Sequence, residues 1–94
     1  MDTQCYLEAL KKVMEKRFPA TDYCIGCYQD EAVCIQPSQN GWLVYCGERG
    51  NHYEQVECDT VLSACLAFIR KMTHIKDDII NMENDLLRYI AQAA

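Results

Sequence analysis

The sequence predicts one α+β domain over residues 1–94, with an N-terminal helix, a four-stranded antiparallel meander, and two C-terminal helices packed on one face of the sheet. Apolar residues recur at helical spacing near both ends of the chain, and short apolar stretches separated by turn residues fill the middle. The length of 94 residues allows one hydrophobic core. With 50% hydrophobic and 24% charged residues, the composition is typical of a folded protein.

The first predicted element is an amphipathic helix over residues 4–18. Leu7, Leu10, Met14 and Phe18 follow one another at spacings of three and four, which places them on one face of a helix. Pro19 ends the helix, because proline disfavours helical backbone in the residue before it.

The middle of the chain predicts four short strands, at residues 23–28, 32–36, 42–46 and 52–57. Turn residues separate them, and Asn40-Gly41 is the strongest turn signal among these. Because the connections are short, we expect the strands to pair as antiparallel neighbours.

Two helices are predicted after the sheet. Asp59 is the expected N-cap of the first, which is apolar over most of its circumference and therefore central to the core. The second covers residues 75–91. The break near Thr73 and His74 is inferred from length alone, so the sequence leaves open whether residues 59–91 form one helix or two. The stripe on the second helix favours core packing over a dimer surface; it consists of Ile75, Ile79, Met82, Leu86 and Ile90.

The charge is unevenly distributed along the chain. The net charge is −5, which argues against a generic nucleic-acid binder, since phosphate contacts need a basic surface. Residues 21–69 hold seven acids and one base, Arg49, and so carry −6. Such a segment either attracts a basic partner or simply keeps strands and turns hydrated, and both interpretations remain open.

Seven cysteines are interpreted as reduced, mostly buried thiols in a reducing compartment, because their number is odd and they lie in apolar segments. Cys24 and Cys27 form the one Cys-x-x-Cys pair. A zinc site needs a second pair or suitably spaced histidines, and a strand would point these two side chains to opposite faces. We therefore expect no metal, no cofactor and no redox role. No local pattern joins a cysteine to His52 or His74 as a catalytic pair, so we expect no enzyme activity.

The predicted sheet is rich in aromatic residues, which either pair in the core or anchor a partner protein. Trp42 alternates with Val44 and Cys46 and is expected in the core, whereas Tyr45 and Tyr53 are candidate anchors. The longest mainly apolar stretch, residues 61–69, is too short to span a bilayer, and the N-terminus lacks the features of a secretory signal. We expect a soluble, cytoplasmic protein with no membrane partner.

Three segments together resemble small immunity proteins of bacterial polymorphic toxin and contact-dependent inhibition systems. These are Gly41-Trp-Leu-Val-Tyr-Cys-Gly-Glu-Arg-Gly50, the strand at residues 53–57, and the apolar helix at residues 59–69. The resemblance implies a non-enzymatic inhibitor that binds the toxic domain of a partner toxin in the cytoplasm and occludes its active site or a neighbouring surface. Many such toxins are nucleases with basic substrate clefts.

The predicted interface is the acidic sheet segment, facing a protein partner with a basic surface. Its residues are Asp22, Asp30, Glu31, Glu48, Glu54 and Glu57, with Tyr45 and Tyr53 as anchors. The oligomeric state, monomer or homodimer, stays open. The alternative function is a small acidic type III secretion chaperone, which would dimerise and bind an extended effector segment.

Overall fold

The N-terminal segment forms helix α1 (Thr3–Glu15) in the computed structural model, which describes residues 3–93. The inward face of α1 buries Ala9, Leu10, Val13 and Met14, as its spacing predicts. The helix begins one residue earlier and ends three residues earlier than expected. The carbonyl oxygen of Met14 accepts hydrogen bonds from the amides of residues 17 and 18, which closes the helix before Pro19.

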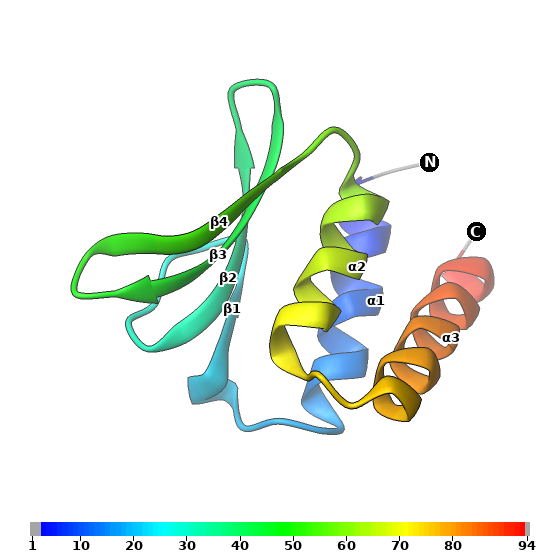
Figure 1. Cartoon of the computed structure of the whole chain (residues 1–94). Coiled ribbons are helices and arrows are strands. Elements are labelled where there is room, and N and C mark those ends of the chain that lie inside the picture. The colour runs from blue at the N-terminus through cyan, green and yellow to red at the C-terminus, as the bar shows by residue number, and fades with distance from the viewer. Residues whose placement is uncertain (1–2, 94) are drawn as a thin grey trace.

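Four strands form one sheet in the order β1-β2-β3-β4 (Figure 1), namely β1 (Tyr23–Ile25), β2 (Ala32–Ser38), β3 (Gly41–Glu48) and β4 (Asn51–Cys58). The β2–β3 and β3–β4 pairs are antiparallel, as expected. The β1–β2 pair is parallel, with Cys24 opposite Cys34, so the prediction of a purely antiparallel meander is wrong. The sheet is mixed.

The error arises at the end of β1. The strand was expected to run to residue 28, but it ends at Ile25, and Gly26 takes a φ of 86°, a left-handed value that glycine adopts without strain. Residues 26–31, here called the crossover segment, then pass over the outer face of the sheet before β2 begins. Gly47 lies beneath this segment, where an added Cβ would be 2.5 Å from the Gln29 oxygen. A glycine at position 47 therefore permits the crossing.

Two separate helices follow the sheet, α2 (Val61–Met72) and α3 (Lys76–Ala93), so the predicted break is confirmed. The N-cap of α2 is Thr60 and not Asp59, which corrects that prediction. Thr60 and Ser63 form a reciprocal capping box, in which the Thr60 side chain accepts a hydrogen bond from the Ser63 amide at 3.1 Å.

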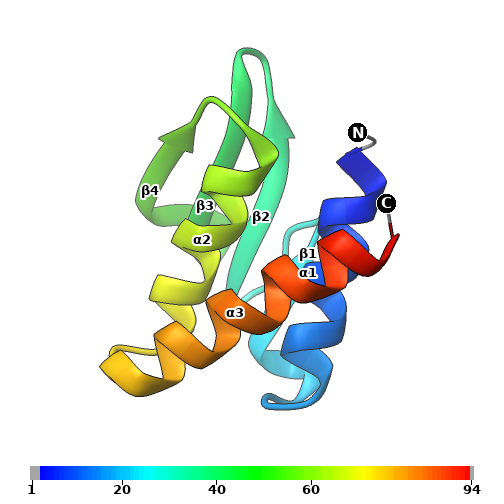
Figure 2. The same ribbon diagram turned by 90° about the vertical axis from the view of Figure 1, so that its right-hand side faces the viewer.

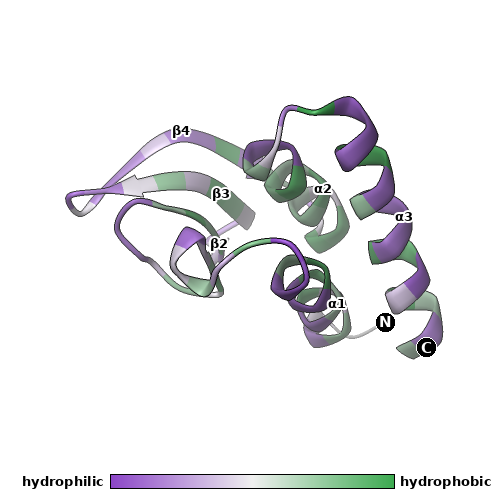
Figure 3. Cartoon of the chain, turned by 90° about the horizontal axis from the view of Figure 1, so that it is seen from below, coloured by the Kyte–Doolittle hydropathy of each residue, from purple (hydrophilic) through white to green (hydrophobic). Residues whose placement is uncertain are grey.

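The helices all lie on one side of the sheet (Figure 3). Helix α2 packs on β2, β3 and β4, whereas α3 crosses over α1 and α2 in an outer layer (Figure 2). Phe68 of α2 is fully buried in the core between the layers, together with Ile35 and Val44 of the sheet. Trp42 packs against this core, as expected.

Most of the apolar stripe on α3 serves the core. Met82, Leu86 and Ile90 are buried against the other helices, whereas Ile75, just before the helix, is 62% exposed. None of the helices that the structure describes has the length and apolar character needed to cross a membrane.

Candidate functional site

Three of the predicted site residues surround one depression of about 370 Å³, here called the acidic depression. Asp22, Glu31 and Glu48 line it, and apolar side chains including Val33 and Met72 form its other walls. These carboxylates come from distant parts of the sequence, so the convergence is a product of the fold.

Each carboxylate of the acidic depression is held at the end of an element. Asp22 ends a short 3₁₀ helix (Ala20–Asp22), Glu31 ends the crossover segment, and Glu48 is the last residue of β3. The Glu31 amide donates a hydrogen bond to the Gly47 oxygen at 2.8 Å, which ties the end of the crossover segment to the end of β3. Glu31 has a φ of 55°, so its backbone is held in an unfavourable conformation by its surroundings.

The carboxylates of the acidic depression are not neutralised by ion pairs. Among residues 3–93, no basic group lies within ion-pair distance of Asp22, Glu31 or Glu48. Lys71 of α2 also lines the depression, but its Nζ pairs with Glu54 at 3.8 Å. Carboxylates left unpaired around a partly apolar floor favour binding of a cationic group.

Asp30 has a structural role that the sequence did not reveal. The Tyr28 hydroxyl donates a hydrogen bond to its carboxylate, and the Gly50 amide donates another at 3.3 Å. Both bonds stabilise the charged form, and they hold the pKa of Asp30 below its usual value, the Tyr28 bond being the larger cause. The bonds fasten the crossover segment to the β3–β4 turn, where Arg49 and Gly50 both have positive φ.

Three further predicted residues lie on β4, the edge strand of the sheet. Tyr53 is 48% exposed, and Glu54 and Glu57 are also exposed. Glu54 lies close to the acidic depression through its contact with Lys71. Glu57 lies beside the β2–β3 turn, six residues along β4 from Asn51, which pairs with Glu48. Six residues of a strand span about 20 Å, so the structure does not bring Glu57 to the acidic depression.

Tyr45 is not an exposed anchor, which corrects that part of the predicted interface. Its side chain is fully buried on the face of the sheet opposite the helices. The His52 ring stacks on it with a centroid distance of 3.8 Å, and its hydroxyl donates a hydrogen bond to Gln36 at 2.6 Å. The residues that cover it, Tyr28 and His52, come from the crossover segment and β4.

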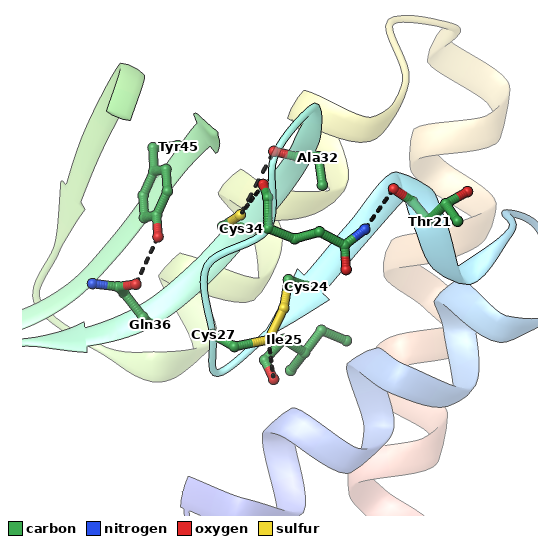
Figure 4. The surroundings of a disulfide bond; sticks show 9 residues. Thr21, Cys24, Ile25, Cys27, Ala32, Cys34, Gln36 and Tyr45 are labelled. Atoms are coloured by element: carbon green, nitrogen blue, oxygen red, sulfur yellow. Dashed lines mark hydrogen bonds between the residues drawn. A yellow bond between two sulfur atoms is a disulfide. The ribbon is translucent and has the colours of Figure 1, made fainter. Parts of the chain in front are cut away.

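Cys24 and Cys27 form a disulfide, which corrects the prediction that all seven cysteines are reduced (Figure 4). The expectation that these side chains point to opposite faces assumed a strand through residue 28. Because β1 ends at Ile25 and the chain turns at Gly26, the two Cα atoms are only 5.5 Å apart. The bond joins β1 to the start of the crossover segment.

The free thiols are Cys5, Cys34, Cys46, Cys58 and Cys65. Burial raises the pKa of Cys46, which lines the acidic depression, and that of Cys58, and it raises the pKa of Cys65 to about 12. A raised pKa opposes formation of the reactive thiolate. Burial therefore favours the neutral thiol form of Cys46 in the acidic depression.

Sequence reasoning missed Lys71 and the groove beside it. This groove of about 540 Å³ lies between β4 and α2, with Val56, Leu66 and Ala67 on its walls and Arg70, Lys71 and His74 nearby. The basic pair at the end of an apolar helix was visible in the sequence, but its position opposite β4 depends on how α2 packs.

Comparison of the chain with protein-family models, curated proteins and solved structures finds no match. Within residues 3–93, no group of three or more histidine, cysteine, aspartate or glutamate side chains is placed to hold a metal ion.

Proposed function

We propose that this chain is a cytoplasmic immunity protein, which binds the toxic domain of a partner toxin and occludes its active site or a neighbouring surface. The observation that carries the proposal is the acidic depression. Asp22, Glu31 and Glu48 arrive from three separate segments and have no ion-pair partner among the described residues. Like charges gathered in this way disfavour the isolated fold slightly, and a cationic partner relieves the repulsion.

The partner surface that fits this depression is basic. A nuclease holds its substrate phosphates with lysine and arginine, so an acidic protein competes for the same electrostatic field. The exposed edge strand β4 extends the surface, with Tyr53 and Glu54 next to Val56, which is 40% exposed. Aromatic and apolar side chains beside charged ones are typical of protein interfaces.

One observation favours the alternative of a dimeric secretion chaperone. Ile80 and Leu87 lie on the outer side of α3, 52% and 50% exposed, and their spacing of seven residues places them on one helix face. Light scattering after size-exclusion chromatography tests whether this face forms a dimer, because a monomer gives 10.8 kDa and a dimer gives twice that mass. The bound partner separates the two functions: an immunity protein binds a folded domain one-to-one, whereas a chaperone dimerises alone and binds an extended, disordered effector segment.

The experiment begins with capture of the partner by the tagged chain from the cytosol of its native cells at low salt. Captured proteins are identified by mass spectrometry, produced recombinantly, and tested for toxicity in cells with and without this chain. We expect a basic toxic domain whose growth inhibition is abolished by co-expression of this chain. A captured domain that remains toxic in its presence would contradict the proposal.

Charge reversal locates the interface once that domain is known. The double variant Asp22→Lys/Glu48→Lys should slow association at least about tenfold at low salt, because it removes electrostatic steering. The control Glu8→Lys/Asp78→Lys makes the same change in net charge on α1 and α3 and should associate close to the wild-type rate. Equal rates for both variants would exclude the acidic depression as the interface.

A further inference from the structure

Three cysteines lie together on the outer face of the sheet, at the start of the crossover segment (Figure 4). Cys24 is bonded to Cys27, and it is also the direct neighbour of Cys34 in the parallel β1–β2 pair. Cys24 and Cys34 belong to the same small cluster with Ala32 and Tyr45, so both side chains face the same side. Neither the acidic depression nor the proposed inhibition uses these sulfurs.

The geometry gives Cys24 two partners within disulfide range. A disulfide needs Cα atoms about 4.4–6.8 Å apart. Neighbouring strands lie about 4.8 Å apart, which brings Cys34 into that range, and Cys27 is at 5.5 Å. We propose that Cys24, Cys27 and Cys34 form a three-sulfur redox site, in which the disulfide exchanges between Cys24–Cys27 and Cys24–Cys34.

The exchange step needs no external oxidant. The Cys34 thiol gives its proton to solvent, and the resulting thiolate attacks the Cys24 sulfur. As the new S–S bond forms, the Cys24–Cys27 bond breaks, and Cys27 leaves as a thiolate that takes a proton from water. One disulfide and one thiol are present before and after the step.

Exposure assigns different roles to the two partners of Cys24. Cys27 is exposed, whereas Cys34 is fully buried and donates weak hydrogen bonds to the Gln29 and Ala32 oxygens, both at 3.6 Å. An external thiolate therefore reaches the Cys27 sulfur first. The Cys34 thiol must break its contact with the Gln29 oxygen before it attacks Cys24, so rotation of the Cys34 side chain precedes the exchange.

A single variant tests whether Cys34 reaches Cys24. Folded Cys27→Ser is oxidised with glutathione disulfide under native conditions, quenched with acid, and cleaved after Glu31. This cleavage separates Cys24 from Cys34. We expect the predominant product to be the two peptides joined by a Cys24–Cys34 disulfide. If Cys24 is recovered mainly as its glutathione adduct with Cys34 free, the proposal is wrong.

The matched control is Cys27→Ser/Cys34→Ser. Because Cys46 lies on the same proteolytic fragment as Cys34, loss of the linked peptides in this variant identifies Cys34 as the partner, and their persistence would overturn the assignment. The wild-type chain in a glutathione buffer provides a measurement without substitutions. Acid trapping and alkylation should recover a fraction with free Cys27 and linked Cys24–Cys34, and absence of that fraction would contradict exchange. These measurements need no partner protein, so their results test the redox site independently of the proposed inhibition.

Discussion

At the scale of single residues, Tyr45 shows how the outer face of this sheet is completed without a helix. Its ring is covered by His52 and lies near Tyr28, and its hydroxyl bonds to Gln36. Burial is the largest cause that raises its pKa to about 12, and nearby Cys34 adds to the effect. The folded state therefore favours the neutral phenol.

Because the folded state favours the neutral phenol of Tyr45, we expect the free energy of unfolding to fall at high pH as this group ionises. The usual tyrosine pKa of 10.0 applies to the unfolded chain, so the contribution of the neutral phenol is complete below pH 10 and is lost as the pH rises towards about 12. At neutral pH, Tyr45→Phe should cost about 1 kcal/mol, because the Gln36 hydrogen bond is lost.

Urea unfolding of both proteins between pH 8 and pH 11.5 measures the effect. The free-energy gap between wild type and Tyr45→Phe should narrow above pH 10, since only the wild type loses stability through this group. A gap that stays constant over this range would show that Tyr45 ionises equally easily in the folded and unfolded states.

At the scale of elements, the start of α2 depends on which residue caps it. Asp59 and Thr60 are both residue types that cap helices well, so composition alone does not distinguish them. The structure places Val61 first in the helix and gives the capping hydrogen bonds to Thr60 and Ser63.

We therefore expect Thr60→Ala to lower the free energy of unfolding by about 1 kcal/mol, because the Ser63 amide loses its acceptor. Asp59→Ala is the matched control and should change stability by less than about 0.5 kcal/mol. Urea unfolding monitored by circular dichroism measures both. A larger loss for Asp59→Ala than for Thr60→Ala would mean that the helix begins one residue earlier.

At the scale of the whole molecule, one core holds the sheet and the three helices together. Phe68 is completely buried in that core and faces elements from both ends of the chain. Leu87 lies in the outer helix and is 50% exposed, so it contributes little buried area.

The difference in burial between Phe68 and Leu87 predicts that replacing each by alanine changes the free energy of unfolding by very different amounts. Phe68→Ala should lower the free energy of unfolding by about 3–5 kcal/mol through lost burial and a residual cavity. Leu87→Ala should change it by less than about 0.5 kcal/mol. Thermal and urea unfolding measure both. If Phe68→Ala does not fold, Phe68→Leu should fold with a loss of about 1 kcal/mol. A Leu87→Ala loss as large as that of the Phe68 variants would mean that the outer face of α3 is buried in solution.

The local patterns of the chain determined the helices and the approximate strands. Helical spacing in α1, α2 and α3 and turn residues around β2, β3 and β4 act over a few residues, so they can be read without knowing the fold. The concentration of acids between residues 21 and 69 was likewise visible.

Only the tertiary structure decided which of these acids meet and which side chains are hidden. The sequence did not show that Asp22, Glu31 and Glu48 surround one depression, or that Glu57 lies far along β4. Because β1 ends at Ile25 and the chain crosses over the sheet before β2, β1 pairs with β2 in parallel and not in the expected antiparallel arrangement. Burial, ion pairing and disulfide contact depend on which distant residues the path of the chain brings together. Residue spacing is a local property, so it does not determine that path.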